Sequence, residues 1–132
     1  MSSREAISIL SSLDSTPDAL REKVDDSPEN TLEACRVVID KLDQAIIRLL
    51  NERVATASVI ADIKKKLDLP VYVPSREADV IRNIIESNTG PLADDAARRL
   101  YERIIDETRS NERQRYQDGV IDESANTDDN FD

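Results

Sequence analysis

A long uninterrupted stretch dominates this sequence, because the chain contains neither glycine nor proline from Glu29 to Leu69. Apolar side chains recur in it at alternating spacings of three and four residues, at Leu32, Cys35, Ile39, Leu42, Ile46 and Leu49. This heptad-like spacing predicts one stripe on a single helix. A helix of about 38 residues is roughly 57 Å long, whereas a compact domain of about 100 residues has a radius of gyration near ~13 Å. The stripe therefore needs a partner, most simply a second copy of the chain.

The composition favours an all-α fold. Only two glycines and five prolines interrupt the 132 residues, and aromatic residues make up 3% of them. Sandwiches and barrels need frequent turns together with aromatic and β-branched residues, so this composition argues against an all-β fold. No run of about 18 apolar residues is present, so we expect no membrane span. The first residues also lack the apolar core of a signal peptide.

Cysteine and histidine usage excludes several kinds of site. Cys35 is the single cysteine, and histidine is absent. An internal disulfide is therefore impossible, and a reducing compartment such as the cytoplasm fits best. Zinc and iron sites are not expected. Catalytic groups of the Ser/His/Asp or Cys/His kind are excluded, because each requires a histidine. We expect neither a metal nor a cofactor.

The formal net charge of −10 is unevenly distributed along the chain. Residues 1–33 carry a net charge of −5 and residues 117–132 carry −6, whereas residues 34–116 carry +1. The acidic ends are typical of solvated or disordered segments, and the overall sign argues against binding to nucleic acid. The functional residues are therefore expected in the middle of the chain.

Helix signals divide the chain into three segments. Residues 1–26 hold two short amphipathic pieces, the second opened by Thr16-Pro17, and are expected to form a helical extension or arm. Residues 27–117 are expected to form the main helical domain, whose long helix opens at Ser27-Pro28. Residues 118–132 are expected to be an acidic disordered tail, with Gly119 ending the last helix.

Two shorter helices are expected after the long one in the main domain. A loop set by Pro70 and Pro74 precedes Ser75, which is expected to cap a helix over residues 76–87. Residues 88–91, with the sequence Asn-Thr-Gly-Pro, end that helix. The last helix is expected to begin at Leu92 or Asp94 and to reach residue 117. The main domain is thus a three-helix protomer with one very long first helix.

Cations occupy positions where the long stripe should be apolar. Arg53 and Lys64 both continue it, and their separation of 11 residues leaves them within about 20° of each other around the helix. Burying two cations requires an anion, either acidic side chains or a bound ligand. Arg36 lies about 100° around the helix from Arg53, so it suits the pocket of a partner chain. Arg76 opens a helix against the dipole preference, which also suggests an anion. Together these residues indicate a site for a small polyanion.

The joint spacing of these residues matches a known pattern. It comprises Arg36, Ile39-Asp40-x-Leu42-Asp43, Leu49-Leu50-x-Glu52-Arg53, Lys64, Pro70-Val71, Arg76-Glu77, Gly90-Pro91-Leu92 and Tyr101-x-x-Ile104-Ile105. Over about residues 31–115 the chain resembles the all-helical class of chorismate mutases. The resemblance implies an intertwined homodimeric helical bundle with two active sites shared between the chains. It also implies a cofactor-free rearrangement of chorismate to prephenate on the route to phenylalanine and tyrosine.

The resemblance also implies roles for individual residues. Arg53, together with Arg36 of the partner chain, would bind carboxylates of the substrate. Lys64 would reach the ether oxygen and a carboxylate, and Arg76 would help fix the loop and the carboxylate end. Glu77 would accept a hydrogen bond from the ring hydroxyl. Arg53, Lys64 and Glu112 are the expected catalytic residues.

Three further positions complete the expected site. The backbone N–H near Val73 would assist Glu77, although many members of the family have Asp at this position. Thr108 falls where a small hydroxyl residue usually contacts a carboxylate. Glu112 stands where most members carry Gln, and a carboxyl group can donate to the ether oxygen only when it is protonated. A neighbouring dianion favours that protonation, whereas Lys64 opposes it.

Other functions fit the same pattern. A pyruvate lyase of this fold that acts on isochorismate and a mutase for the amino analogue of chorismate are close alternatives. A non-catalytic helical dimer that serves as a regulatory or docking module is an alternative of a different class. Docking to another enzyme of the pathway is also possible for the catalytic protein.

Overall fold

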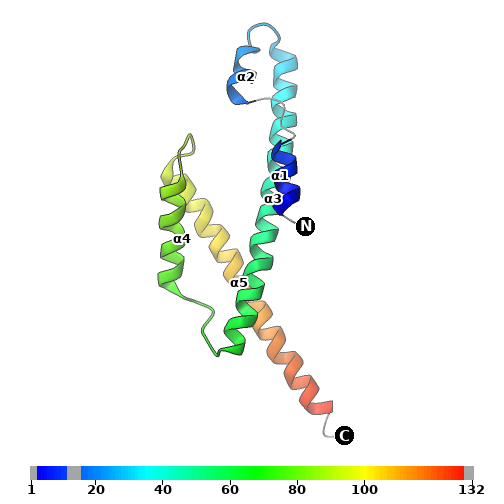
Figure 1. Cartoon of the computed structure of the whole chain (residues 1–132), viewed down its shortest axis with the longest axis vertical. Helices are drawn as coiled ribbons and strands as arrows, with labels where there is room; N and C mark the ends of the chain where they lie inside the picture. Colours follow the sequence, from blue (N-terminus) through cyan, green and yellow to red (C-terminus); the bar gives the residue numbers. More distant parts are fainter. Residues whose placement is uncertain (1–2, 12–15, 130–132) are drawn as a thin grey trace. The chain divides into compact units, whose positions relative to one another are not determined.

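The computed structural model describes residues 3–11 and 16–129, and describes side chains as far as Asp118 (Figure 1). Every element in these ranges is an α-helix, which confirms the all-α prediction. The helices are α1 (Ser3–Ser11), α2 (Pro17–Glu22), α3 (Pro28–Lys66), α4 (Pro74–Ser87) and α5 (Asp94–Asp129). Helices α3, α4 and α5 correspond to the three that were expected in the main domain, and α1 and α2 precede them.

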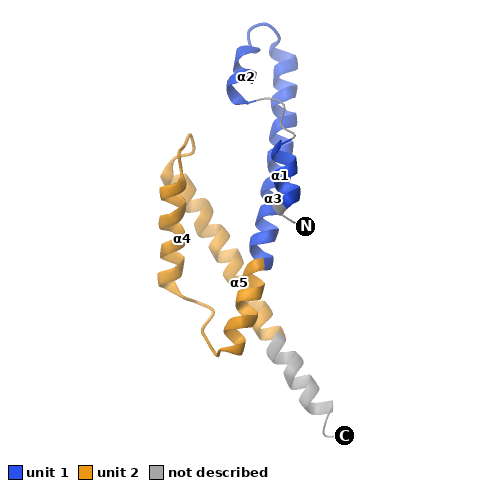
Figure 2. Cartoon of the chain, viewed as in Figure 1, with its two compact units in different colours: residues 1–55 blue, residues 56–132 orange. Residues whose placement is uncertain are grey.

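The chain has two compact units, residues 1–55 and 56–132, and the boundary falls within α3 (Figure 2). The first unit contains α1, α2 and the larger part of α3. The second contains the end of α3 together with α4 and α5. Arg36 and Arg53 belong to the first unit, and the other predicted site residues belong to the second.

In the first unit, α1 and α2 are attached to α3 by specific contacts. Ala6 of α1 and Ala45 of α3 are both buried, and the Arg48 guanidinium lies 3.4 Å from the Glu5 carboxylate. Helix α2 begins where Thr16-Pro17 predicted, because the Thr16 hydroxyl accepts a hydrogen bond from the Ala19 amide at 3.2 Å. The buried Thr31 hydroxyl donates hydrogen bonds to the carbonyls of residues 23 and 27, and these bonds fix the turn between α2 and α3.

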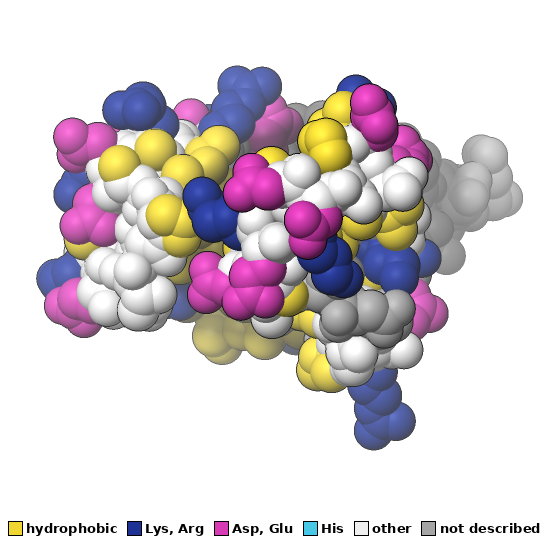
Figure 3. All heavy atoms as spheres, turned by 90° about the horizontal axis from the view of Figure 1, so that it is seen from above, with side chains coloured by type: hydrophobic (Ala, Val, Ile, Leu, Met, Phe, Trp, Pro, Cys, Tyr) yellow, Lys and Arg dark blue, Asp and Glu magenta, His cyan; other side chains and the backbone are white. Residues whose placement is uncertain are grey.

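The long uninterrupted helix predicted from the sequence is present as α3. The side chains of α3 that are buried are small, namely Ala45, Ala57 and Ala61, together with Thr31. The predicted apolar stripe instead faces outward in the single chain, since Leu32, Ile39 and Ile46 each expose more than half of their surface. Apolar side chains lie among charged ones on the face of the molecule shown in Figure 3. Among the described residues, no large side chain is fully buried.

Helix α3 ends in a Schellman motif. The amide of Leu69 donates to the carbonyl of Lys64 at 2.7 Å, and the amide of Asp68 donates to that of Lys65 at 3.2 Å. Asp68 has a φ of 55°, in the left-handed region that this motif requires at its first residue after the helix. The turn directs the following loop back along the end of α3 and so places residue 71 beside the Lys64 side chain.

In the second unit, α4 and α5 pack side by side with the loop 88–93 between them (Figure 1). The Asn88 amide group donates to the Leu92 carbonyl and to the Asp94 carboxylate, each at 2.8 Å. Gly90 has a φ of 76°, which explains the glycine at this position. Ala97, Ile105 and Thr108 are the buried side chains among the residues of α5 up to Asp118.

Two predicted helix boundaries were wrong. Helix α4 is not capped by Ser75: it begins at Pro74, and Val73 is its N-cap without a side-chain hydrogen bond. Proline with its fixed φ is favoured in the first turn, so the start lies one residue before the serine. Helix α5 passes Gly119 and continues to Asp129, since one glycine within a helix costs only about 1 kcal/mol relative to alanine.

Between residues 3 and 129, apart from the gap at 12–15, no helix combines the length and apolarity that crossing a membrane requires. Within the same described part of the chain, no group of three acidic or cysteine side chains is arranged to hold a metal ion.

Candidate functional site

Lys64 and Glu112 form the centre of the candidate site. The Lys64 ammonium donates to the Val71 carbonyl at 2.8 Å, and its Nζ lies 3.7 Å from Oε2 of Glu112. The side chains are only 19% and 13% exposed, so this pair is shielded from water more than the pairs of Arg109 with Glu77 and of Arg115 with Asp62. The last turn of α3 supplies the lysine and the middle of α5 supplies the glutamate. The structure thus brings together two residues that the family resemblance assigned to the same ether oxygen.

Glu77 is held by an arginine that the sequence analysis did not select. Nε of Arg109 donates to Oε2 of Glu77 at 2.9 Å, and Nη2 donates to Oε1 at 3.0 Å. The same guanidinium donates to Asp106 at 2.8 Å and lies 5.0 Å from the centre of the Tyr72 ring. Its hydrogen bonds to Glu77 raise the pKa of Arg109 above its usual value. Arg109 therefore ties the 67–73 loop and the start of α4 to α5.

The start of α4 determines which hydrogen-bond donors Val73 and Arg76 can present to a ligand. The amides of Arg76 and Glu77 donate to the Val73 carbonyl at 3.1 and 3.2 Å, and Pro74 has no N–H. The amides of Val73 and Ser75 therefore remain the candidate backbone donors near this position. The Arg76 side chain is exposed.

Thr108 lies on the buried face of α5, one turn before Glu112. Its residue exposure is 7%, and its hydroxyl donates to the Ile104 carbonyl at 2.7 Å. A threonine hydroxyl has one proton, so contact with a carboxylate would require it to leave this backbone acceptor. Thr108 thus lies on the same face of α5 as Glu112, and its hydroxyl donates a hydrogen bond within its own helix.

The first unit carries the remaining two predicted residues. Arg36 is exposed, and its guanidinium lies 3.9 Å from Glu33 on the preceding turn. Arg53 is half-buried on α3. An exposed arginine in a long intrahelical ion pair can readily turn to another anion.

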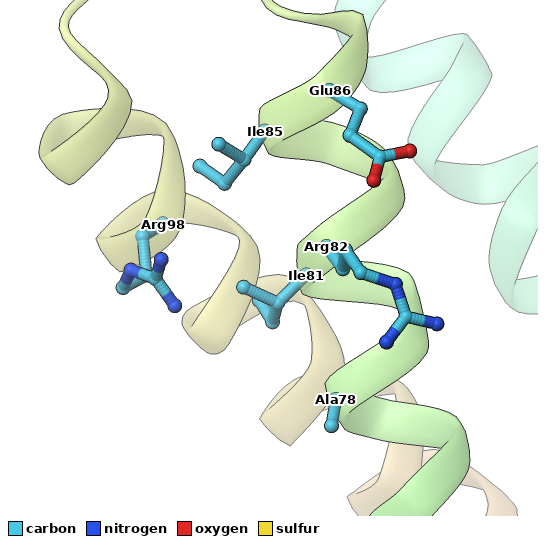
Figure 4. A pocket seen from close by; sticks show the side chains of 6 residues that line it. All are labelled: Ala78, Ile81, Arg82, Ile85, Glu86 and Arg98. Atoms are coloured by element: carbon cyan, nitrogen blue, oxygen red, sulfur yellow. The ribbon is translucent and has the colours of Figure 1, made fainter.

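A separate groove lies between α4 and α5, with a volume of about 330 Å³. Its lining residues are Ala78, Ile81, Arg82, Ile85, Glu86 and Arg98. Ile81 and Ile85 point from α4 toward α5, which carries Arg98 (Figure 4). None of the predicted site residues lines this groove, so it is distinct from the centre formed by Lys64 and Glu112.

Helical spacing contained a signal for Arg109 that the sequence analysis did not use. Ile105, Thr108, Arg109 and Glu112 follow one another at spacings that keep them on one face of α5. With Thr108 and Glu112 assigned to the site, helical spacing places Arg109 on its border. A carboxylate at the position of Glu77 also needed a partner from a neighbouring element.

Comparison with known proteins identifies the family. The family model for chorismate mutase type II matches residues 35–113. The chain belongs to the chorismate mutase type II family. The match covers the end of the first unit and most of the second, and it includes every predicted site residue.

Curated relatives of this chorismate mutase type II chain are longer proteins. It is 38% identical over 78 residues to the bifunctional chorismate mutase/prephenate dehydratase of Aquifex aeolicus, covering 56% of this chain and 22% of that one. It is 41% identical over 78 residues to the protein of the same name from Neisseria gonorrhoeae, covering 59% and 21%. The T-protein of Enterobacter agglomerans is 38% identical over 50 residues, covering 38% and 13%. The chain spans about a fifth of the length of the bifunctional relatives. No solved structure matches it.

Proposed function

We propose that this chain is a chorismate mutase, which rearranges chorismate to prephenate in the biosynthesis of phenylalanine and tyrosine. The observation that carries the proposal is the shielded pair of Lys64 and Glu112, with Nζ and Oε2 3.7 Å apart, in a chain of this family. The chain has no histidine and one cysteine, so catalysis must come from positioning and fixed charge.

An intramolecular rearrangement suits such a site. The ether bond of chorismate breaks as a carbon–carbon bond forms, and negative charge develops on the ether oxygen. The Lys64 ammonium stabilises that charge, and its bond to the Val71 carbonyl fixes its position. Arginine side chains hold the two carboxylates, so the substrate is kept in its folded conformation.

Glu112 is proposed as a second donor to the ether oxygen. In its ionised form it attracts Lys64, at 3.7 Å, and repels a substrate dianion. In its protonated form it donates a hydrogen bond to the ether oxygen and leaves the lysine charge to the substrate. The protonated form is thus the productive one.

The active molecule is proposed to be an intertwined homodimer in which α3, α4 and α5 of each chain form a three-helix protomer. The support is the outward-facing apolar stripe of α3, where Leu32, Ile39 and Ile46 are more than half exposed. Covering them with a second copy removes this apolar surface from water. In that arrangement Arg36 enters the site of the partner chain, beside Arg53.

A direct assay tests the proposal. Purified protein is mixed with chorismate, and the loss of chorismate and the identity of the product are recorded. We expect prephenate, and we expect Lys64→Ala to lower kcat/KM by about 100-fold or more. Lys66→Ala is the matched control, since Lys66 lies at the end of the same helix and is exposed. No loss of chorismate would instead favour the non-catalytic dimeric module.

Product analysis also separates the substrate alternatives. Conversion of isochorismate with release of pyruvate would identify a lyase, and conversion of the 4-amino analogue would identify the corresponding mutase. The curated relatives join a chorismate mutase to a prephenate dehydratase by name. We therefore also propose that this chain docks to another enzyme of its pathway, which co-purification with the tagged protein tests.

A further inference from the structure

Glu77 is the residue proposed to meet the ring hydroxyl of chorismate, and Arg109 takes up part of its hydrogen-bonding capacity. An ionised carboxylate has about four lone-pair directions. Arg109 uses one on each oxygen, at 2.9 and 3.0 Å. The remaining directions stay available for a hydroxyl donor. The carboxylate can therefore accept from a ligand while the guanidinium holds it in one orientation.

Arg109 also changes the charge that Glu77 presents to a ligand. The two side chains are 24% and 26% exposed, so their charges are only partly screened by water. Asp106 contacts the same guanidinium but is 58% exposed, and its charge is therefore largely screened. The neighbouring Arg76 adds a second positive charge at the start of α4. A ligand group that approaches Glu77 thus meets a neutralised carboxylate rather than a free negative charge.

We propose that Arg109 is a positioning residue that selects the ring substituent of the substrate by neutralising and orienting Glu77. A neutral hydroxyl can donate to the held carboxylate and does not interact strongly with the guanidinium charge. A ring ammonium, as in the 4-amino analogue, gains less from a neutralised carboxylate and is repelled by Arg109. This inference rests on the proposed function, and it explains how the site distinguishes chorismate from that analogue.

The geometry around Arg109 suits a positioning role. Its guanidinium lies over the Tyr72 ring at 5.0 Å and contacts Asp106 on its own helix. Together with Glu77, these residues are three neighbours that fix the plane of the guanidinium. A planar, bidentate contact of this kind holds a carboxylate in one orientation, which a lysine ammonium cannot do. Arg109→Lys therefore keeps the charge and loses the orientation.

The chain offers a matched control on the same helix. Arg115 makes a similar bidentate contact with Asp62, at 2.9 and 2.8 Å, but both side chains are more than half exposed. Arg115→Ala removes the same guanidinium from α5 without touching Glu77. Differences between the Arg109 and Arg115 variants thus report on the site rather than on loss of an ion pair.

The experiment measures discrimination between the two substrates. For each variant, KM and kcat are determined with chorismate, and the inhibition constant of the 4-amino analogue is determined from its effect on chorismate turnover. We expect Arg109→Ala to lower the ratio of that inhibition constant to the chorismate KM by about tenfold, because the carboxylate then attracts the ammonium. Arg109→Lys should keep most of the discrimination but lower kcat, and Arg115→Ala should match the wild type.

A double-mutant cycle shows whether Arg109 acts through Glu77. In the Glu77→Gln background, Arg109→Ala should change the discrimination ratio less than twofold, since no carboxylate charge remains to be neutralised. Arg109→Gln, which keeps most of the side chain, replaces Arg109→Ala if the alanine variant does not fold. An unchanged ratio in the folded Arg109 variants, or an equal change in both backgrounds, would overturn the inference. Failure of the proposed function would appear separately, as no chorismate turnover by the wild type, and the inference would fall with it.

Discussion

Lys64 and Glu112 lie opposite each other on α3 and α5, with Nζ of the lysine 3.7 Å from Oε2 of the glutamate. In the proposed mechanism, the carboxylate and the substrate compete for one ammonium group. Protonation of Glu112 releases Lys64 and also creates a hydrogen-bond donor. We therefore predict that kcat/KM for chorismate is higher below neutral pH and falls as the pH rises and Glu112 ionises.

Glu112→Gln provides the comparison for this pH dependence. Glutamine donates at every pH and carries no charge, so the variant should give a flat profile that equals or exceeds the wild type above neutral pH. The measurement is kcat/KM from about pH 5 to pH 9 for both proteins. Two flat and similar profiles would show that protonation of Glu112 plays no part.

Complementation between two inactive variants tests whether sites are shared between chains. Arg36→Ala and Arg53→Ala should each be nearly inactive, because each removes a carboxylate-binding guanidinium from both sites of a dimer. If one chain supplies Arg36 and the other Arg53, a mixed dimer contains one intact site. Random pairing of equal amounts should then restore about a quarter of the wild-type activity.

The mixing experiment requires exchange of chains. The two variants are unfolded together, refolded and assayed, with each variant refolded alone as the control. Activity that stays at the level of the separate variants, although mixed dimers are detected by mass spectrometry, would place Arg36 and Arg53 in the same chain's site.

The long helix could be predicted because its signals are local. The chain has no glycine or proline from Glu29 to Leu69, and α3 runs without a break from Pro28 to Lys66. The ends of the other helices were less predictable. Pro74 rather than Ser75 opens α4, and Gly119 does not end α5, because each depends on a difference of about 1 kcal/mol that neighbouring contacts can reverse.

The site shows the same division between local and non-local information. Lys64 and Glu112 were identified by family-specific spacing, and the structure brings them together. Arg109 was missed because its role depends on Glu77, a residue 32 positions away on another helix. Periodicity places Arg109 on the correct face of α5 but does not reveal which acid it meets. Only the packing of α4 on α5 determines that pairing.

The outward-facing stripe on α3 predicts how the proposed dimer can be weakened. Ile46 is 53% exposed in the single chain and lies on the stripe proposed to meet the partner. We predict that Ile46→Glu shifts the protein toward monomer at micromolar concentration, because a charge would be buried without a partner. Activity should fall with the dimer. Analytical ultracentrifugation over a dilution series measures the shift.

Val37→Glu is the control for the stripe. Val37 is also exposed, but it is nine residues before Ile46 and thus about 180° around the helix from it. This variant should remain dimeric at the same concentrations. Equal dissociation of both variants would mean that the partner contacts α3 on all sides, and no dissociation of either would remove the stripe from the interface.

Asp68 gives a prediction about stability rather than activity. Its φ of 55° lies in the left-handed region, where a side chain is disfavoured and glycine is not. The Schellman hydrogen bonds of the motif come from the backbone, so Asp68→Gly retains them. Glycine relieves the backbone strain of the folded state but also increases the conformational entropy of the unfolded chain. We expect the first contribution to the free energy of unfolding to be larger, with a net stabilisation of up to ~1 kcal/mol. Asp68→Ala keeps a side chain at the same φ and should be no more stable than the wild type. Urea unfolding of the three proteins measures both effects, and a glycine variant less stable than the alanine variant would show that the left-handed turn does not persist in solution.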